Sequence, residues 1–473
     1  MEQGSGIRFG TDGWRAVIAD AFTFDNVERV TQAAAVYFDN GHGPKRMIVG
    51  YDRRFLSDHF ASAAANVLAS NGYEVILTDR PTPTPAVSYA VFARKARGGV
   101  MLTASHNPPH FNGYKLKAAN GGPADSQICQ LVESFLGKAR IGGQPRHGRT
   151  GKVVIEEEDI QPEYFQAIKK LVDFKLIAKT PLRFAHEPLF GVGAGCFDTL
   201  LAKTRCKVRT FHMDHDPNFG GICPEPIAKN YGPAARLLRR EPADFCLVTD
   251  GDADRIGGMD GRGRPLTTHQ IICLLLDHFI RNRQGRGRVV KALTTTSMVD
   301  KICDAHGLPL TETGVGFKYI CSEMLKGDVL LGFEESGGIG FPGHIPERDG
   351  ILAGLMVLEM LAVERKPLGT LLKRLEKDYG PHRYGRVDMH FPMEKRDALL
   401  LQCTSNPPAR LLRSTVSQVK NFDGVKLIAA DGSWLMWRGS GTEPVLRIYA
   451  EASSETAVDR LLQQGVRIAK ASS

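Results

Sequence analysis

Short apolar runs alternate with longer amphipathic stretches over most of the chain, up to about residue 375. The run MIVGYD (47–52) predicts a buried strand, the segment 60–72 a helix that stops at Asn71 and Gly72, and EVILTD (74–79) the next strand. Strands that alternate with helices form parallel sheets that are covered on both faces. The pattern therefore predicts α/β architecture for this part of the chain.

The same alternation recurs at 182–203, 244–252 and 288–307, so three α/β units of roughly a hundred residues each fit before the pattern changes. From Tyr379 the chain has mostly strands, expected at 385–391, 416–422, 424–431, 433–440 and 445–452, and then one helix at 454–470, which predicts an α+β domain. Interruptions of the periodicity set the expected domain limits. We expect three tandem α/β domains (mixed-sheet sandwiches) and a C-terminal α+β domain, at residues 1–157, 158–263, 264–378 and 379–473.

The composition is that of an ordinary globular protein, with 42% hydrophobic and 24% charged residues. No window reaches the roughly 18 apolar residues that a membrane span needs, and the opening MEQGSGIRFG has no apolar signal core. The nine cysteines are dispersed without a C-x-x-C pair, which favours buried free thiols over a disulfide framework or a zinc site. We therefore expect a cytoplasmic protein without a membrane partner.

A net charge of +9 is compatible with nucleic acid, an anionic membrane or a phosphorylated small molecule as partner. The densest basic stretch, RNRQGRGR at 281–288, has no aromatic residues between its arginines. This favours a solvated loop and no nucleic acid partner. Nucleic-acid binding stays open as an unfavoured alternative, and it predicts steeply salt-dependent affinity.

The stretch TASHNPPHFNGYK (103–115) places a serine and a histidine, Ser105 and His106, on a loop that two prolines stiffen. Lys115 follows ten residues after the serine. A serine hydroxyl is a poor nucleophile until a base removes its proton or its oxygen carries a transferable group. From this loop alone, a nucleophile and a plain turn are equally compatible interpretations.

The stretch LVTDGDADRIG (247–257) carries three alternating aspartates, Asp250, Asp252 and Asp254, directly after a predicted strand. A looped backbone can direct all three carboxylates at one point, and Mg²⁺ takes such oxygen ligands. Arg255 follows and can donate to the same oxygens. The spacing lacks the glutamate of an EF-hand and the threonine of an aspartyl-nucleophile phosphatase, so we expect a magnesium site.

Two glycine-spaced loops carry further polar groups. In GFEESGGIGFPGH (332–344), Glu334 and Ser336 suit recognition of sugar hydroxyls, although a glycine-rich connector is nearly as compatible. In RGSGTEPVLR (438–447), a guanidinium, hydroxyls and backbone N–H groups predict an anion cradle. The candidate phosphate ligands there are Arg438, Ser440, Gly441 and Thr442.

Each of the four loops falls in a different expected domain, which predicts one central cleft shared by all four domains. In this order, the motifs T-A-S-H-N-P-P with N-G-Y-K, D-G-D-A-D-R, G-F-E-E-S-G and R-G-S-G-T-E-P resemble the α-D-phosphohexomutases, the phosphoglucomutase and phosphomannomutase superfamily. The opening GTDGWRAV is similar to the N-terminal arginine loop of this family, and VGYDRRFLS to the strand and helix that follow it. The resemblance extends over essentially the whole chain.

The resemblance implies that Ser105 carries a phosphoryl group, and that one Mg²⁺ per chain binds the aspartates of 250–254 and a phosphoryl oxygen on Ser105. The group would pass to a hexose phosphate and give a bound 1,6-bisphosphate, which turns around and returns its other phosphate to the serine. This bisphosphate is also the expected activator. The cradle at 438–442 would hold the phosphate that does not react, while Glu334 and Ser336 hold the ring hydroxyls.

The resemblance also assigns catalytic roles to Arg255, Lys115, Arg15 and His106. The first three would stabilise the charge that develops on transfer. Lys115, Arg15 and His106 are candidates for the general base, although arginine is a poor base at neutral pH. For His106 we favour a role in holding the loop.

Departures from the family pattern bear on the sugar. Gly338 stands where many dual-specificity members have a histidine, and His344 or Arg348 could replace it. Lys318, in TGVGFKYI, resembles a basic residue of the substrate loop in the third domain of the family. The T-A-S-H-N-P-P loop differs from the S-A-S-H-N-P-F form usual for phosphoglucosamine mutases. We therefore expect glucose phosphate as substrate first, mannose phosphate second and glucosamine phosphate last.

A second function from the same loops also stays open. A metal-dependent sugar phosphatase would pass the phosphoryl group of Ser105 to water and release free phosphate. We expect a phosphosugar substrate in either case, and a monomer or a homodimer.

Overall fold

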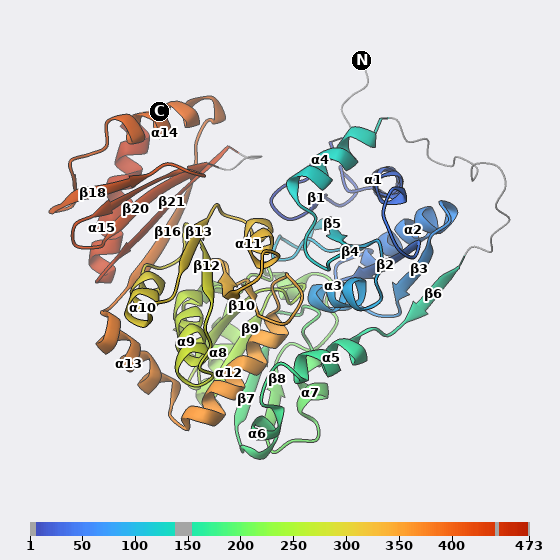
Figure 1. The fold of residues 1–473 in the computed structure, drawn as a ribbon, viewed down its shortest axis with the longest axis horizontal. Coiled ribbons are helices and arrows are strands. Elements are labelled where there is room, and N and C mark those ends of the chain that lie inside the picture. Colours follow the sequence, from blue (N-terminus) through green and yellow to red (C-terminus); the bar gives the residue numbers. More distant parts are fainter. Residues whose placement is uncertain (1–5, 138–153, 440–443, 472–473) are drawn as a thin grey trace. The chain divides into compact units, whose positions relative to one another are not determined.

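The computed structural model describes residues 6–137, 154–439 and 444–471, which divide into two compact units (Figure 1). The first unit comprises the described residues up to Gly285 together with Gly316–Gly369. The second comprises Arg286–Val315 and the described residues from Thr370 onward. Among the helices of these ranges, none is long and apolar enough to cross a membrane.

The first unit begins with a six-stranded mixed sheet in the order β1-β5-β4-β2-β3-β6. Strands β2, β3, β4 and β6 are parallel, whereas β5 is antiparallel to both of its neighbours. The bounds are β1 (Trp14–Val17), β2 (Arg46–Tyr51), β3 (Glu74–Thr78), β4 (Gly98–Leu102), β5 (Phe111–Ala118) and β6 (Ile155–Glu158), with α1 (Phe24–Asp39), α2 (Ser57–Ser70), α3 (Thr84–Ala93) and α4 (Ser126–Phe135).

Helices cover both faces of this sheet because alternate side chains of its strands are apolar. Met47 and Val49 of β2 pack in the core that α1 and α2 share, whereas Ile48 packs with residues of α3 on the other face. The strands predicted at 47–52 and 74–79 are confirmed to within a residue at each end. The predicted helix begins earlier than expected, at Ser57, and ends at Ser70 with Asn71 as its C-cap.

A second, five-stranded sheet of the first unit has the order β11-β10-β9-β7-β8. Strands β7, β8 and β9 are parallel, and β10 returns antiparallel to β9. The loop between β9 and β10 carries the three aspartates of 250–254. The bounds are β7 (Arg183–Glu187), β8 (Lys207–Thr210), β9 (Phe245–Thr249), β10 (Ile256–Asp260) and β11 (Pro265–Leu266), with α5 (Gln161–Lys169), α6 (Phe174–Lys179), α7 (Cys196–Leu201) and α8 (Gly232–Arg240).

The rest of the first unit supplies the loop that precedes a long buried helix, α12 (Gly350–Glu364). This helix is apolar on all sides, and Asp349 caps it by accepting a hydrogen bond from the backbone N–H of Leu352 at 2.8 Å. Strands β14 (Val329–Phe333) and β15 (Ile339–Gly340) form an antiparallel pair around the glycine-rich stretch. The remaining helices are α9 (Thr268–Arg281) and α11 (Phe317–Met324).

The second unit contains an antiparallel six-stranded sheet, β16-β21-β20-β19-β18-β17, and a parallel pair, β12 with β13. The five strands and the final helix that the sequence predicts are confirmed, while α14 and the short β17 were not expected. The bounds are β12 (Arg288–Ala292), α10 (Met298–His306), β13 (Leu310–Thr313), α13 (Leu368–Tyr379), β16 (Arg383–His390), α14 (Met393–Ser405), β17 (Arg410–Leu411), β18 (Ser414–Lys420), β19 (Val425–Ala429), β20 (Trp434–Gly439), β21 (Val445–Ala452) and α15 (Glu455–Ala471).

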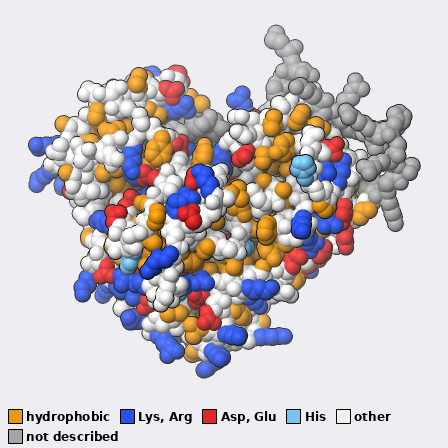
Figure 2. Space-filling model, in the orientation of Figure 1, with side chains coloured by type: hydrophobic (Ala, Val, Ile, Leu, Met, Phe, Trp, Pro, Cys, Tyr) orange, Lys and Arg blue, Asp and Glu red, His pale blue; other side chains and the backbone are white. Residues whose placement is uncertain are grey.

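The basic stretch at 281–288 is mostly an exposed loop after the end of α9, as the sequence favoured, although some of its arginines also contact the rest of the protein. Arg281 ends α9 and pairs with Asp277 at 2.6 Å, and Arg283 lies 3.5 Å from Glu359 and donates to the carbonyl of Leu171 at 2.8 Å. On the face shown in Figure 2, Lys and Arg side chains are interspersed with Asp and Glu. All nine cysteines are free and seven are buried, as predicted.

Candidate functional site

Ser105 lies in the turn that follows β4, with its side chain buried. Its φ of 52° is in the left-handed region, which is uncommon for residues other than glycine and marks a backbone held by its surroundings. Its Oγ donates a hydrogen bond to Oδ2 of Asp250 at 2.8 Å, across 145 positions of sequence. The predicted nucleophile and the predicted metal cluster are therefore in direct contact.

Asp250, Asp252 and Asp254 are all buried, and one carboxylate oxygen from each lies within 4.8 Å of the others. Oδ1 of Asp250 accepts from the backbone N–H groups of Asp254 and Arg255 at 3.1 Å, which leaves Oδ2 facing the serine. Burial and the neighbouring carboxylates of Asp252 and Asp254 raise the pKa of Asp250 well above its usual range. The cluster thus concentrates negative charge in a place that water does not reach.

The chemistry of this donor set fits a divalent cation. The Oδ1 atoms of Asp252 and Asp254 are buried and have no hydrogen-bond partner among the described residues. A buried carboxylate oxygen without a partner costs free energy, and a hard cation such as Mg²⁺ would satisfy two of them at once. The three aspartates are therefore suited to hold a metal ion beside Ser105.

Lys115, on β5, is buried on the other side of the aspartates. Its Nζ lies 2.7 Å from Oδ2 of Asp252, 2.9 Å from Oδ2 of Asp254 and 2.8 Å from Oδ2 of Asp12. Although burial lowers the pKa of Lys115, the three carboxylates raise it above its usual range. The ammonium is therefore held in its charged form, which is unsuited to a general base in this arrangement.

His106 and two arginines flank the serine. Burial, with Arg255 and Arg15 nearby, holds the pKa of His106 well below its usual range, so the ring is neutral. Its Nδ1 lies 3.2 Å from Nη1 of Arg255, which can only donate, so Nδ1 is the acceptor and the ring proton is on Nε2. Arg15 donates to Oδ1 of Asn107 at 2.6 Å. The structure thus places four of the predicted catalytic residues around Ser105.

The glycine-rich loop between β14 and β15 lies directly against the loop that carries the three aspartates of 250–254. Gly338 forms a β-bridge with Arg255, and the backbone N–H of Ile256 donates to the carbonyl of Gly337 at 3.0 Å. Gly337 has a φ of +95°, and a Cβ there would lie 2.0 Å from the carbonyl oxygen of Ile256. Only glycine allows this approach, and it brings Glu334 beside the aspartates.

Arg348 links the glycine-rich loop to the rest of the cluster. Its guanidinium donates to Glu334 at 3.0 Å, to Asp254 at 2.9 Å and to Asp12. A Cβ on Gly338 would lie 2.6 Å from Cδ of Arg348, so the arginine takes the space that a side chain at this position would fill.

Of the two replacements considered from the sequence, His344 does not lie in the cluster. Its Nε2 pairs instead with Asp349 at 2.9 Å, and the same carboxylate accepts a hydrogen bond from the hydroxyl of Tyr164 at 2.7 Å. Ser336 stays local, donating to Oε1 of Glu334 at 2.8 Å.

Three residues of the cluster were not anticipated as site residues. Asp12 binds both Lys115 and Arg348. Arg54 and its partner Asp52 lie beneath residues 103–111, here the serine loop. Asp12 precedes the predicted Arg15 in the same GTDGWR stretch, so its acidic side chain was a visible signal. Arg54 gave no such signal, because apart from Asp52 its hydrogen-bond and ion-pair partners are backbone carbonyls, and the stretch VGYDRRFLS predicted only a strand and a helix.

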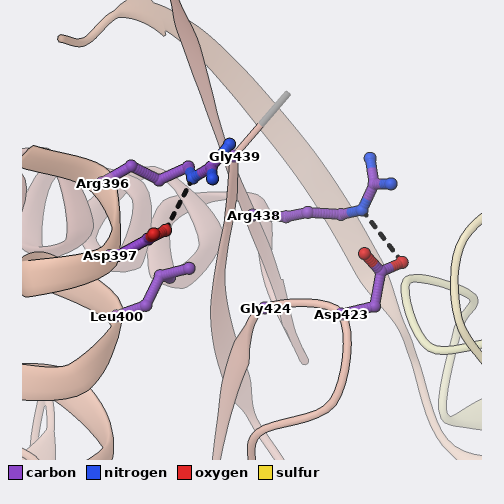
Figure 3. A pocket seen from close by; sticks show the side chains of 7 residues that line it. All are labelled: Arg396, Asp397, Leu400, Asp423, Gly424, Arg438 and Gly439. Atoms are coloured by element: carbon purple, nitrogen blue, oxygen red, sulfur yellow. Dashed lines mark hydrogen bonds and ion pairs between the residues drawn. The ribbon is translucent and has the colours of Figure 1, made fainter. Parts of the chain in front are cut away.

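Lys318 and Arg438 are each described within their own compact unit. The ammonium of Lys318, on α11, lies over the ring of Tyr319 at 5.4 Å from its centroid. Arg438 belongs to the second unit, where its Nε donates to Asp423 at 3.1 Å and it lines a cavity of about 290 Å³ together with Arg396 (Figure 3). Ser440, Gly441 and Thr442 lie outside the described residues. The cleft shared by all four domains stays a prediction.

Comparison with known proteins gives an independent result. Residues 6–140, 162–263 and 267–379 match the alpha/beta/alpha domains I, II and III of phosphoglucomutase/phosphomannomutase, and residues 405–468 match its C-terminal domain. The chain is 29% identical to the phosphoglucomutase/phosphomannomutase of Thermococcus kodakarensis, over 97% of this chain and 98% of that one. It is also 29% identical to the phosphoglucosamine/phosphogalactosamine mutase of Sulfurisphaera tokodaii, over 96% and 97% of the two chains.

Among solved structures, a candidate phosphomannomutase from Thermus thermophilus matches with a TM-score of 0.86 and 37% identity. The match covers 99% of this chain and 100% of that one. The similarity thus extends through both compact units.

Proposed function

Because the chain belongs to the phosphoglucomutase/phosphomannomutase family and is an intramolecular phosphotransferase, we propose that it moves a phosphoryl group between C1 and C6 of a hexose phosphate, with Ser105 as the carrier. The observation that carries the proposal is the buried contact of Ser105 with Asp250. It lies beside two carboxylate oxygens, Oδ1 of Asp252 and Oδ1 of Asp254, that have no hydrogen-bond partner among the described residues. A serine in a strained turn against a potential metal site has the setting of a reacting group, because a plain turn needs neither feature.

The proposed reaction has two half-reactions that balance. In the first, the bond between Ser105 Oγ and phosphorus breaks and phosphorus forms a bond to the free hydroxyl oxygen of the hexose monophosphate, while the proton of this hydroxyl replaces phosphorus on Ser105 Oγ. The resulting 1,6-bisphosphate turns around in the site. In the second, the bond between the other phosphorus and its sugar oxygen breaks, Ser105 Oγ takes this phosphoryl group, and the proton of the serine hydroxyl passes to the sugar oxygen that leaves. Added bisphosphate would phosphorylate an empty serine, which explains its role as activator.

Mg²⁺ would be held by Asp250, Asp252 and Asp254, with an oxygen of the phosphoryl group on Ser105 as a further ligand. When bound, the ion would neutralise charge on the phosphoryl oxygens and so lower the barrier to attack. The protein itself adds fixed cations: Arg255 is held by His106, and Lys115 by Asp252 and Asp254. These groups need no reorganisation as charge develops, which is the condition for effective electrostatic stabilisation.

For the sugar we propose glucose phosphate as preferred substrate, then mannose phosphate, then glucosamine phosphate. Glu334 would accept hydrogen bonds from ring hydroxyls, with Ser336 beside it. Arg348 supports the last place of glucosamine phosphate, because it puts a fixed positive charge next to Glu334, where an ammonium group would be repelled and a hydroxyl would not. The relatives named above act on different sugars by name, so the order rests on these residues of the chain.

The phosphate that does not react would bind the loop that begins at Arg438, with Lys318 as a further cationic contact. Two arginines, Arg438 and Arg396, line one cavity of the second unit beside Gly439 (Figure 3). Each is paired with an aspartate of the same cavity, Asp423 and Asp397, which a bound phosphate would have to replace as partner. We also propose that the chain has four domains, with the three boundaries after residues 157, 263 and 378. The family matches support them, because each match lies within one proposed domain except for a single residue, Tyr379.

A coupled assay tests the proposal. Glucose 1-phosphate with a trace of glucose 1,6-bisphosphate and Mg²⁺ is expected to give glucose 6-phosphate without release of phosphate, and Ser105→Ala is expected to give neither product. Free phosphate without glucose 6-phosphate would indicate a sugar phosphatase and contradict the proposal. Rates on the 1-phosphates of glucose, mannose and glucosamine, measured side by side, test the sugar order.

A further inference from the structure

The guanidinium of Arg54 lies beneath the serine loop and binds four of its backbone carbonyls. Its Nη2 donates to the carbonyls of Ser105 and Asn107, both at 2.7 Å, and its Nη1 to those of Pro108 at 2.8 Å and Phe111 at 3.0 Å. The side chain is fully buried. One planar group therefore fixes the backbone from the strained Ser105 to Phe111.

The charge of Arg54 is offset by Asp52, whose Oδ2 lies 3.2 Å from its Nε. Asp52 in turn accepts from the hydroxyl of Thr103 at 2.6 Å, and that hydroxyl accepts from the backbone N–H of Ser105 at 2.9 Å. The hydroxyl of Ser57, the first residue of α2, donates to the other oxygen of Asp52 at 2.8 Å. The Arg54–Asp52 pair thus connects the serine loop to α2 and to the end of β4.

The two prolines of the loop fit this arrangement. A carbonyl that turns toward Arg54 normally sends the N–H of the same peptide to the opposite side, where it needs a partner of its own. The carbonyls of Asn107 and Pro108 precede Pro108 and Pro109, and these peptides have no N–H. Two of the four carbonyls can therefore converge on Arg54 without leaving a donor unsatisfied.

We propose that Arg54 is a positioning residue for phosphoryl transfer, holding the serine loop so that Ser105 Oγ stays directed at Asp250; this inference rests on the proposed function. Lysine could keep the charge, but its ammonium is a point charge on a flexible stem and cannot reproduce the planar fork. Arg54 touches neither the serine hydroxyl nor the aspartates in the contacts described, so it acts through the backbone.

The test compares Arg54→Lys with a matched control, Arg97→Lys. Arg97 is also a domain I arginine that donates to three carbonyls, those of Phe38, Asp39 and Gly43, but in a different loop. For Arg54→Lys, kcat is expected to fall about 100-fold, as for an ångström-scale misplacement of a reacting group. KM is expected to stay within about threefold, because the Arg54 side chain is fully buried and does not face solvent, from which a substrate binds. Arg97→Lys is expected to match the wild type.

Two further readouts separate positioning from loss of folding. The rate at which Ser105 takes a phosphoryl group from glucose 1,6-bisphosphate, followed by intact-protein mass spectrometry, is expected to fall together with kcat. In Arg54→Ala, added guanidinium ion is expected to restore part of this rate, whereas methylammonium is not. A kcat for Arg54→Lys within about threefold of wild type, or a loss that only follows the unfolded fraction in circular dichroism, would overturn the proposal.

Failure of the proposed function would look different. A wild-type protein that takes no phosphoryl group on Ser105 would refute that function. In that case, hydrogen–deuterium exchange of a peptide covering 103–112 would still show whether Arg54 holds the loop. Exchange no faster in Arg54→Lys than in Arg97→Lys would overturn the positioning role by itself.

Discussion

Two buried clusters of charged side chains, one in each compact unit of the described chain, differ in the sign of the charge that burial disfavours. The first is the site cluster around Ser105, Asp250, Lys115 and Arg348 in the first unit. The second, here the lysine cluster, lies in the second unit and consists of Lys291, Asp300, Glu312, Lys420, Lys426 and Glu451.

The lysine cluster has as many carboxylates as lysines, but the carboxylates do not reach all three ammonium groups equally. The Nζ of Lys426 lies 3.8 Å from Glu312 and 4.1 Å from the centroid of the Trp434 ring, and it donates to the carbonyl of Leu293 at 2.7 Å. Burial, with Lys291 nearby, lowers the pKa of Lys426 to about 7. The charge that burial disfavours here is therefore the positive charge of Lys426.

In the site cluster the charge that burial disfavours is negative, because burial and two neighbouring carboxylates raise the pKa of Asp250. Three carboxylates converge there next to a serine that could carry a phosphoryl group. The comparison teaches that burial of charge does not by itself mark an active site. An excess of carboxylate beside a strained nucleophile does, because a cation and a phosphoryl group can complete it.

The largest expected effect is that of Asp250→Asn, which removes one charge from the site cluster with little change of shape. Mutase activity is expected to fall by at least about a thousandfold, because metal-ion catalysis contributes several kcal/mol. Without metal, the melting temperature is expected to equal or exceed that of wild type, since repulsion among the carboxylates is reduced. The coupled assay measures the activity, and scanning calorimetry with and without Mg²⁺ measures the melting temperature. A Mg²⁺-induced rise in the melting temperature of Asp250→Asn as large as in wild type would contradict the metal assignment.

Glu312→Gln is expected to have the opposite profile, because Glu312 is an anion among three lysines. Removing one partner of a buried pair leaves uncompensated charge, so the free energy of unfolding is expected to fall by roughly 3 kcal/mol while kcat stays unchanged. Glu323→Gln, which breaks the surface pair with Lys326 at 2.7 Å, is the control and is expected to cost less than about 1 kcal/mol. Urea denaturation of wild type and the two variants measures the free energy of unfolding. A Glu312→Gln protein as stable as wild type would show that Glu312 contributes no net stabilisation to the folded protein.

The smallest effect is a pH dependence of stability from Lys426. The unfolded chain keeps a proton on this lysine up to about pH 10.4, whereas the folded protein releases it near pH 7, so the free energy of unfolding rises as pH increases from about 7 toward 10. Wild type is therefore expected to gain stability relative to Lys426→Met between about pH 6 and about pH 9.

Thermal melts across this pH range measure the Lys426 effect. The other titratable groups around Lys426, which are Lys291 on β12, Asp300 on α10, Glu312 on β13 and Glu451 on β21, are the same in both proteins. Lys420→Met, which removes an ammonium 2.6 Å from the same Glu312, is the control. A difference between wild type and Lys426→Met that does not change with pH would contradict the lowered pKa.

Much of the fold could be predicted from periodicity, because most elements bury one face against a single core. The strand Val445–Ala452 has the predicted limits, and the three α/β domains with a C-terminal domain are confirmed by the family matches. Helix α14 was missed because its apolar side chains are not concentrated on one face: only Leu399 and Cys403 are buried. Local pattern carries no signal for such a helix.

The residues of the candidate site that belong to side-chain motifs could be predicted from the sequence. Residues that act on backbone groups could not. The aspartates of 250–254 could be predicted because alternating acids after a strand have few other uses. Ser105 needed the resemblance to the family, because its own loop is equally compatible with a plain turn. Arg54 could not be predicted, since the four groups that it binds in the loop of Ser105 are carbonyl oxygens that every sequence has. The choice between His344 and Arg348 also needed the structure, because both are five residues or fewer from Asp349 and only the turn decides which one faces Glu334.

The most direct test of the account is to locate the phosphoryl group. Wild-type protein incubated with glucose 1,6-bisphosphate and Mg²⁺ is digested and analysed by tandem mass spectrometry, before and after a chase with glucose 1-phosphate. The account predicts one phosphoryl group on Ser105 before the chase, its transfer to glucose 1-phosphate to give the bisphosphate during the chase, and no labelling of Ser105→Ala. A phosphoryl group on any other residue, or none on a protein that still interconverts the sugar phosphates, would contradict it.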